Sequence, residues 1–469
     1  GSEMCIRDSF GGIFMKTRMN FKDEFYQKLK LLVLPIAIQN FMLALVSATD
    51  AIMLGWIDQT SLSAVSLAGQ VQFVLSLFIS GIAAGAGIMA AQYWGKQDAA
   101  SIEKVIPIAL RTNLLFSGLF TILAGFCPEM LMRIFTNDAA LVASGSQYLR
   151  AVALSYVLCG ISQVYLILLK NTGHAAVSSR ISSTAVVLNI ILNAILIYGL
   201  CGAPALGIRG AAYATVAARV VELIWAYLET KKPERVRILW NRLFSSAGKI
   251  LSEDFWRYTL PVLAASLVWG IAYVLYSVIM GHMGSDAVAA NSITSIAKSL
   301  LSCLIRGVSG GAGVLIGNLL GANELEKARE YGGRLSHLSI AIGIVTGGLL
   351  MLISPAIVHF APLSDTAAEY LQYMLLFCGL NLMAQSVNTT VLDGIFCAGG
   401  DAKFDMQGNI GAMWCFSVPL GFLAAFWLKL PVMVVYCIVN LDEIVKLPAV
   451  YHHYKKYIWV RNITRDVED

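Results

Sequence analysis

The sequence predicts an all-α integral membrane protein in which twelve transmembrane helices form two pseudo-symmetric six-helix lobes. Hydrophobic residues make up 57% of the 469 residues and charged residues only 13%, whereas about 25% of the residues in soluble proteins are charged. Twelve apolar runs are long enough to cross a hydrocarbon core of about 30 Å. The last six runs also repeat sequence features of the first six.

The chain is expected to begin with a tail, residues 1–30. Its first fourteen residues have no helical periodicity, and we interpret them as a scar of cloning or assembly, with a natural start at Met15 or Met19. The basic, amphipathic stretch that follows, up to Lys30, is expected to lie along the membrane surface as a helix. The N-lobe, residues 31–230, then contains six predicted spans, at residues 31–56, 64–94, 105–126, 143–169, 177–200 and 208–229.

A polar, basic connector, residues 231–255, is the only long charged interruption of the sequence, so it marks the boundary between the lobes. The C-lobe, residues 256–450, contains the other six predicted spans, at residues 256–281, 289–318, 334–356, 367–396, 406–427 and 430–449. Residues 451–469 form a second tail.

Lysine and arginine lie mainly in alternate loops. Basic clusters occur at residues 16–30, 231–242 and 455–461, whereas the opposite loops hold little beyond Arg133, Arg209 and Lys429. Basic loops stay in the cytoplasm, so we expect a multi-pass protein of the cell (inner) membrane with both termini cytoplasmic. The net charge of +5 then reflects topology rather than nucleic-acid binding, and the expected partners are membrane lipids and a small molecule.

An internal repeat supports the division into two lobes. Leu34-Pro35 recurs 226 positions later as Leu260-Pro261, and the same offset relates Gly81 to Gly307. Six spans in each copy is an even number, so both copies enter the membrane in the same direction. This is a parallel repeat with its pseudo-twofold axis along the membrane normal, as in one class of secondary transporter.

Asp50 lies inside the first predicted span, where a carboxylate costs about 2.5–3.5 kcal/mol on insertion scales and is rarely present without a role. Asn189 and Asn193 are four residues apart on one helix face, and Thr215 of the sixth span can place a hydroxyl toward the same interior. These side chains offer oxygen atoms, which suit a hard cation such as Na⁺ or a hydrogen-bonded proton. Alternatively, the asparagines only join helices, at about 0.6 kcal/mol for each hydrogen bond.

The second span of the C-lobe contains two cations, Lys298 and Arg306, eight residues apart and therefore near one helix face. Arg306 lies mid-span, so it must face a wet cavity or pair with a carboxylate such as Asp393. If Asp393 neutralises Arg306, the cavity would accept cationic drugs that bind against the faces of its aromatic side chains. A free Arg306 would select amphipathic anions or zwitterions, which we slightly favour. The expected cavity residues are Lys298, Arg306, Trp269, Tyr273 and Tyr276.

The absence of characteristic motifs excludes several function classes. The nine cysteines are scattered without CxxC or CxxH spacing, which argues against a disulfide framework or a zinc site. The glycine-rich runs GIAAGAG and GVSGGAGVLIG lack the GxGxxG spacing of a dinucleotide site and favour close helix packing. No catalytic pair or ATPase motif is present, so we expect neither an enzyme nor a cofactor other than the Na⁺ or proton expected at Asp50.

The sequence resembles the multidrug and toxic compound extrusion (MATE) family from about Leu31 to Lys446. The resemblance rests on TDAIMLG, AQYWGK, NTGH followed by VVLNIILNAILIYG, and GIRGAAYATV in the first lobe, with GAGVLIGNLLGAN and AGGDAKF in the second. It implies two six-helix lobes around a V-shaped cavity and multidrug efflux of amphipathic compounds by Na⁺ or H⁺ antiport. The family's first-lobe cation site corresponds here to Asp50, Asn189, Asn193 and Thr215.

The C-lobe departs from the family. Members with a second cation site carry a glutamate and an aspartate where Trp269 and Ser386 align here, so this lobe is expected to have lost the family's carboxylates. We therefore expect a monomeric, cation-coupled exporter of xenobiotics that works by rigid-body alternating access. The alternatives are a lipid or lipid-linked oligosaccharide flippase of related architecture, an organic-anion exporter, and a channel.

Overall fold

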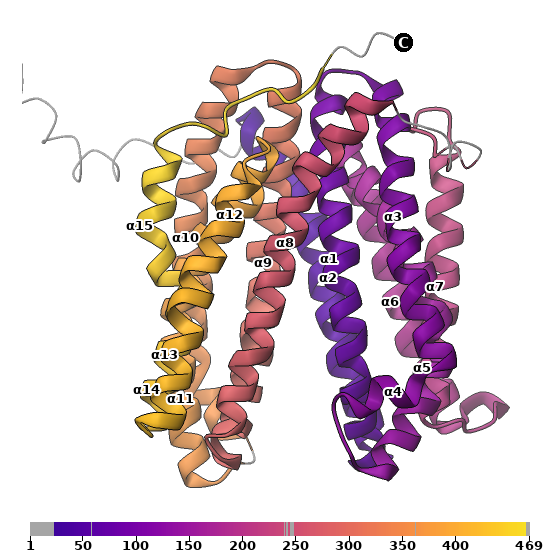
Figure 1. Cartoon of the computed structure of the whole chain (residues 1–469), viewed down its shortest axis with the longest axis vertical. Coiled ribbons are helices and arrows are strands. Elements are labelled where there is room, and N and C mark those ends of the chain that lie inside the picture. The colour runs from indigo at the N-terminus through magenta and orange to yellow at the C-terminus, as the bar shows by residue number, and fades with distance from the viewer. Residues whose placement is uncertain are drawn as a thin grey trace, which may run out of the picture.

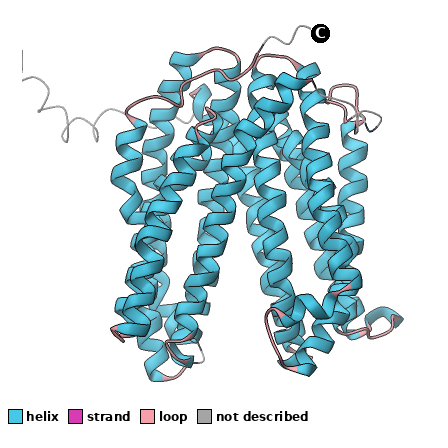
Figure 2. Cartoon of the chain, viewed as in Figure 1, coloured by secondary structure: helices cyan, strands magenta, loops and turns pink. Residues whose placement is uncertain are grey.

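The computed structural model describes residues 23–57, 59–238, 240, 243, 248–361 and 363–465. The predicted scar and natural start lie outside these residues. Within the described part of the chain the structure is helical and contains no strand, as Figure 2 shows. The predicted all-α class and two-lobe layout are confirmed.

The N-lobe contains α1 (Glu24–Gly55), α2 (Gln59–Gly95), α3 (Ala99–Phe126), short α4 (Pro128–Arg133), α5 (Ala139–Leu169), α6 (Ala175–Tyr198) and α7 (Ile208–Thr230). The C-lobe contains α8 (Lys249–Gly281), α9 (Ser285–Gly321), α10 (Leu325–Phe360), α11 (Asp365–Thr389, continued by a π-helical segment Thr390–Phe396), α12 (Ala402–Asn409), α13 (Val418–Phe422), α14 (Val432–Val439) and α15 (Asp442–Tyr454). The π-helical segment Ile410–Ser417 joins α12 to α13, and a second one, Leu423–Trp427, continues α13, so these segments form one crossing.

Twelve crossings result from these helices. Ten described stretches are long and apolar enough to span a membrane, and one of them, Ala139–Tyr198, has 60 residues and comprises both α5 and α6. The chain turns between these two helices at Thr172-Gly173, where Gly173 adopts a φ of +81° that glycine tolerates without steric cost. The twelfth crossing is α14 followed by α15, which are interrupted at Asn440-Leu441.

Three predicted boundaries are wrong. Residues 24–30 belong to α1, so they do not form a separate surface helix; Asp23 caps α1 by accepting a hydrogen bond from the backbone N–H of Phe25. The connector is shorter than predicted because α8 begins at Lys249. The last span is a broken helix rather than a continuous one, and it extends to Tyr454, inside the predicted tail.

The repeat predicted from the sequence is present in the contacts between the lobes. A Cβ on Gly81 would lie 2.9 Å from the Cα of Leu263, and a Cβ on Gly307 would lie 2.6 Å from the Cβ of Ala37. The two contacts are equivalent because both residues of the second pair are 226 positions from those of the first. Thus α2 packs on α8 as α9 packs on α1, and glycine permits this close approach.

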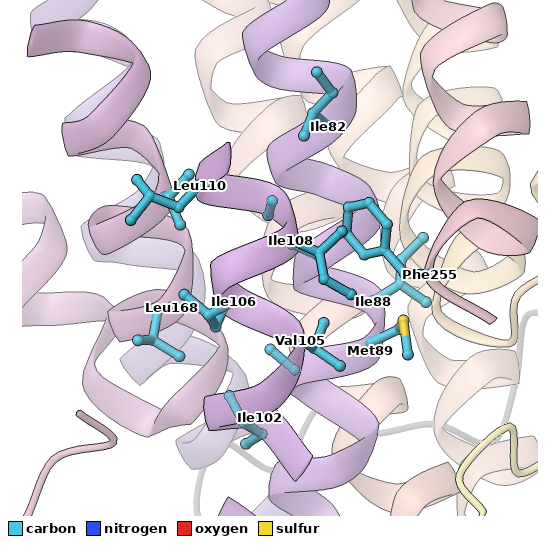
Figure 3. Close-up of a cluster of buried hydrophobic side chains, with 14 of the residues drawn as sticks. Ile82, Ile88, Met89, Ile102, Val105, Ile106, Ile108, Leu110, Leu168 and Phe255 are labelled. Carbon is cyan, nitrogen blue, oxygen red and sulfur yellow. The ribbon is translucent and has the colours of Figure 1, made fainter. Parts of the chain in front are cut away.

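The lobes meet at one end of the bundle and diverge toward the other (Figure 1). At one end of the bundle, α2 of the N-lobe packs against α8 and α9 of the C-lobe, and we call this end the closed end. The opposite end is called the open end. A buried apolar cluster near the closed end combines α2 and α3 of the N-lobe with Phe255 of α8, and Figure 3 shows part of it. A second buried cluster joins Phe25 and Leu29 of α1 to α9 and α10 of the C-lobe, so the core crosses between the lobes on both sides of the closed end.

Candidate functional site

Asp50 lies in a cage of amide and hydroxyl groups inside the N-lobe. Its Oδ1 accepts a hydrogen bond of 2.5 Å from Nδ2 of Asn193. That nitrogen also lies 3.3 Å from Oδ1 of Asn189, whose own Nδ2 donates to the hydroxyl of Thr215 at 3.3 Å. The structure thus brings together four residues from α1, α6 and α7 that the sequence singled out. Helix spacing explains the arrangement, since residues four apart on α6 lie on one face.

The cage forms part of the wall of a 340 Å³ cavity. Asp50 is half-buried there, while Asn193 is fully buried and its Oδ1 has no hydrogen-bond partner among the described residues. A buried acceptor without a donor is costly. The position therefore offers one uncommitted oxygen beside a carboxylate, which is the arrangement that a bound positive charge would satisfy.

A second carboxylate, Glu222, lines the same cavity and was not anticipated from the sequence. It is buried, accepts a hydrogen bond of 2.6 Å from the hydroxyl of Ser162, and forms an ion pair of 3.0 Å with Arg219. The signal was present, because an acid and an arginine three residues apart in the predicted sixth span face one side of the helix. Asp50 is therefore not the only acid of the cavity, but Glu222 is neutralised by its own arginine.

The C-lobe contains a buried charged cluster around Lys446 of α15. The Lys446 ammonium lies 3.0 Å from a carboxylate oxygen of Glu443, 3.8 Å from Asp442 and 3.2 Å from Oδ1 of Asn409. Asn409 in turn donates to Asp405 at 3.1 Å. The family's carboxylates are absent at Trp269 and Ser386, as expected, but the lobe holds buried acids at other positions, which were not singled out from the sequence.

Arg306 and Lys298 of α9 both face a 260 Å³ cavity on the C-lobe. The Lys298 ammonium donates to Oδ1 of Asn381 at 3.0 Å, so its partner is a neutral amide. Arg306 is exposed and, among the described residues, makes no ion pair or hydrogen bond. Arg306 and Asp393 line one adjoining cavity of 440 Å³ without forming an ion pair. The structure therefore favours a cavity-facing Arg306 over a paired one.

Aromatic rings form the wall beside these cations. Trp269 and Tyr273 of α8 are stacked, with ring centroids 5.6 Å apart, and Phe73 of the N-lobe lies 6.5 Å from Tyr273 on the opposite wall. Tyr276 lines the same cavity but is itself buried. The predicted cavity residues thus lie together at one place, where a flat apolar body could contact rings from both lobes.

Comparisons with known proteins identify the family. A family model described as MatE matches residues 35–195 and 261–423, which is more than half of the chain. The "Probable multidrug resistance protein NorM" of Agrobacterium fabrum is 24% identical over 390 residues, which cover 81% of this chain and 83% of the relative. The "Uncharacterized transporter YisQ" of Bacillus subtilis is 21% identical over 427 residues, which cover 91% of this chain and 93% of the relative.

A solved structure described as the "Outward-facing conformation of a multidrug resistance MATE family transporter of the MOP superfamily" superposes with a TM-score of 0.84 at 19% identity, covering 93% of this chain and 97% of that one. At this identity the likeness shows the shared fold. Together with the family match over both lobes, it agrees with the two-lobe helical layout. The protein is a multi-pass membrane transporter and belongs to the MATE family.

Proposed function

We propose that this protein is a secondary active exporter in which a cation moves inward while an amphipathic small molecule moves outward, and that Asp50 is the coupling residue. The observation that carries the proposal is the cage: a carboxylate inside the membrane, bonded to neutral groups, on a cavity wall. A charge at that depth is costly without a function. The relatives described as probable multidrug resistance proteins support drugs as the exported compounds.

The cage fits a coupling cation. Asp50, Asn189, Asn193 and Thr215 would hold Na⁺ through oxygen atoms, which hard cations prefer, and the unpaired Oδ1 of Asn193 is available for it. A proton would need only the Asp50 carboxylate and the hydrogen bond from Asn193. Four oxygen-bearing side chains in one place slightly favour Na⁺ over the proton.

The coupling ion is tested with purified protein in proteoliposomes, by replacing Na⁺ with choline under a fixed pH gradient. Loss of substrate accumulation in choline is the result expected for Na⁺ coupling. Unchanged accumulation would overturn the choice of Na⁺ and assign the role to the proton. Asp50 would remain the coupling residue in that case, because both ions require its carboxylate.

For the substrate, we propose an amphipathic compound with an aromatic body and at least one anionic group. Arg306 is exposed to the cavity and unpaired among the described residues, and Lys298 is held only by an amide. The acids that line the same 260 Å³ cavity, Asp442 and Glu443, are bound to Lys446. The stacked Trp269 and Tyr273 would contact the aromatic body.

This substrate class is tested with matched aromatic probes that differ only in carrying a carboxylate or an amine. Arg306→Gln should weaken inhibition of transport by the anionic probe by about tenfold, the value of one charge-assisted hydrogen bond, and leave the cationic probe unaffected. Arg133→Gln, an exposed arginine of α4 distant from the C-lobe, is the matched control. A wild type that prefers the cationic probe, with no loss of anion affinity in Arg306→Gln, would make Arg306 structural.

We further propose that the protein acts as a monomer in the cell (inner) membrane with both termini in the cytoplasm. The distribution of lysine and arginine supports this orientation, and the cage and both cavities are built from a single chain. The closed end would then face the cytoplasm and the open end the outside. Labelling of cysteines introduced at the closed end should require permeabilised cells; labelling of intact cells would invert the orientation.

A further inference from the structure

The segment Trp459–Arg465 crosses the closed end from the C-lobe toward the N-lobe (Figure 1), and we call it the strap. Its first part is fixed to the C-lobe. Trp459 is fully buried, and Arg461 donates hydrogen bonds to the carbonyl oxygens of Gly399 at 2.8 Å and Gly400 at 2.6 Å. The first part of the strap is therefore anchored to the C-lobe by burial and hydrogen bonds.

The second part of the strap is bound to the N-lobe, mainly through Gln92 of α2. Oε1 of Gln92 accepts a hydrogen bond of 2.8 Å from the backbone N–H of Ile463, while its Nε2 donates to the carbonyl oxygen of Ala398 at 2.7 Å. Nearby, the Lys96 ammonium donates to the carbonyl oxygen of Arg465 at 2.9 Å. Gln92 has no exposed surface. One buried carboxamide thus joins the N-lobe, the strap and the C-lobe.

The far end of the strap also returns to the C-lobe. The guanidinium of Arg465 forms two contacts of 2.8 Å with the carboxylate of Asp254 at the start of α8. Asp254 is buried, and Ile463 packs into the apolar cluster that α2, α3 and α8 share. Over seven residues the strap therefore alternates between the two lobes, and separation of the lobes at this end would break contacts on one side.

The pseudo-twofold axis provides an internal comparison, because an equivalent groove exists on the other side of the closed end. Six residues that contact the strap have counterparts 226 or 227 positions away in the wall of a 720 Å³ cavity. The counterparts of Gln92, Tyr93, Lys96, Gly321, Asp254 and Gly400 are Asn318, Leu319, Ala322, Gly95, Lys28 and Gly173.

This second groove is open: no described segment of the chain occupies it, and Oδ1 of Asn318 is buried without a partner in the described structure. The lobes nevertheless meet there as closely as on the strap side. A Cβ on Gly95 would lie 2.0 Å from the carbonyl oxygen of Asn318, and one on Gly321 would lie 1.8 Å from that of Gln92. Within the described part of the chain, the lobes therefore pack equally closely beside a groove that holds a strap and beside one that does not.

We propose that the strap is a latch that holds the closed end shut, and that its release from Gln92 is a step of the transport cycle. Alternating access between two repeats requires the lobes to separate at the end that is now closed. Contacts that exist in one state and not in the other shift the equilibrium toward the first. The strap thus stabilises the state that is open at the opposite end and slows its conversion.

The latch is tested by measuring distances between the lobes, so the result does not depend on the coupling ion or the substrate. Spin labels are attached at exposed positions in a variant without native cysteines, and distances are measured by pulsed electron resonance in lipid nanodiscs. The closed-end pair is Ala100 with Glu326, and the open-end pair is Ala140 with Thr366. Gln92→Leu keeps the volume but removes the bonds to the strap and to Ala398. Truncation after Asn462 removes the contacts of Ile463 and Arg465 but keeps Trp459 and Arg461.

In both variants the population with a long closed-end distance and a short open-end distance should rise about tenfold, the effect of losing one or two hydrogen bonds. Asn318→Leu, the pseudo-symmetric control, should leave both distance distributions unchanged. Should Gln92→Leu fail to fold, the truncation decides alone. Unchanged distances in the truncated protein, or an equal shift in Asn318→Leu, would overturn the proposal and reduce the strap to surface packing.

Discussion

Replacement of Asp50 by asparagine tests the proposed coupling site with little change of shape. Asparagine is nearly isosteric and can still accept the hydrogen bond from Asn193, which is 2.5 Å long in the structure. What is lost is the negative charge. Hydrogen bonds to a charged group contribute about 1.5–3 kcal/mol against about 0.5–1.5 kcal/mol for neutral ones. The difference, about 1–1.5 kcal/mol, should weaken binding of the ion about 5- to 12-fold.

Asparagine also cannot take up a proton, and Na⁺ in the neutral cage would be an unbalanced charge inside the membrane, so Asp50→Asn should abolish gradient-driven substrate accumulation in proteoliposomes. Yield and thermal stability should stay near wild type, because the cage keeps its hydrogen bonds. Asp365→Asn, which changes an exposed carboxylate at the start of α11, is the matched control and should retain full activity. Asn193→Ala should reduce ion affinity less than Asp50→Asn does. Retained accumulation in Asp50→Asn under an imposed gradient would refute the coupling role.

Three further predictions concern stability and are checked by thermal unfolding of purified protein. Gly85→Val should lower the free energy of unfolding by about 1–3 kcal/mol through overpacking, because a Cβ there would lie 2.3 Å from a hydroxyl of α8. A Cβ on Gly118 would meet open space, so an equal loss in Gly118→Val would contradict the interlobe packing. Glu222→Gln should lower the free energy of unfolding by about 1–3 kcal/mol, because Arg219 loses its charged acceptor. An unchanged unfolding temperature would show that the ion pair contributes nothing to stability. A backbone N–H and then an arginine of α10 hold the pKa of the Asp23 carboxyl below its ordinary 3.8. That stabilisation exists above pH 3.8 and is lost as the pH falls through the lowered pKa, so wild type should unfold at a higher temperature than Asp23→Asn near neutral pH and lose this advantage in acid; a pH-independent difference would exclude the linkage.

Most of the fold followed from two properties of the sequence. Apolar run length sets the number of crossings because the thickness of the hydrocarbon core is fixed, and the 226-residue offset pairs the lobes as the equivalent contacts of Gly81 and Gly307 demonstrate. The interruption at Asn440-Leu441 was not anticipated, because hydropathy averages over the polar residues that follow it. Asp442, Glu443 and Lys446 in the last span were the local signal for this break.

The candidate site was predictable in the N-lobe and only partly in the C-lobe. Asn189 and Asn193 share a helix face by spacing alone, so their approach to Asp50 needed only the packing of two helices. Glu222 was missed because an acid with an arginine three residues away resembles a solvated helix end until its burial is known. The C-lobe acids were missed because the family pattern directs attention to other positions, whereas here the cluster around Lys446 comes from α12 and α15.

The measurement that tests cation-coupled export most directly is accumulation of a fluorescent amphipathic substrate against its own gradient in proteoliposomes. A Na⁺ or pH gradient is imposed across the membrane and then collapsed with an ionophore. Coupled antiport predicts accumulation above the equilibrium level while the gradient lasts, and its loss when the gradient is collapsed. Equal flux with and without the gradient would indicate a channel, and movement of labelled lipid in place of the substrate would indicate a flippase; either result would contradict the proposed mechanism.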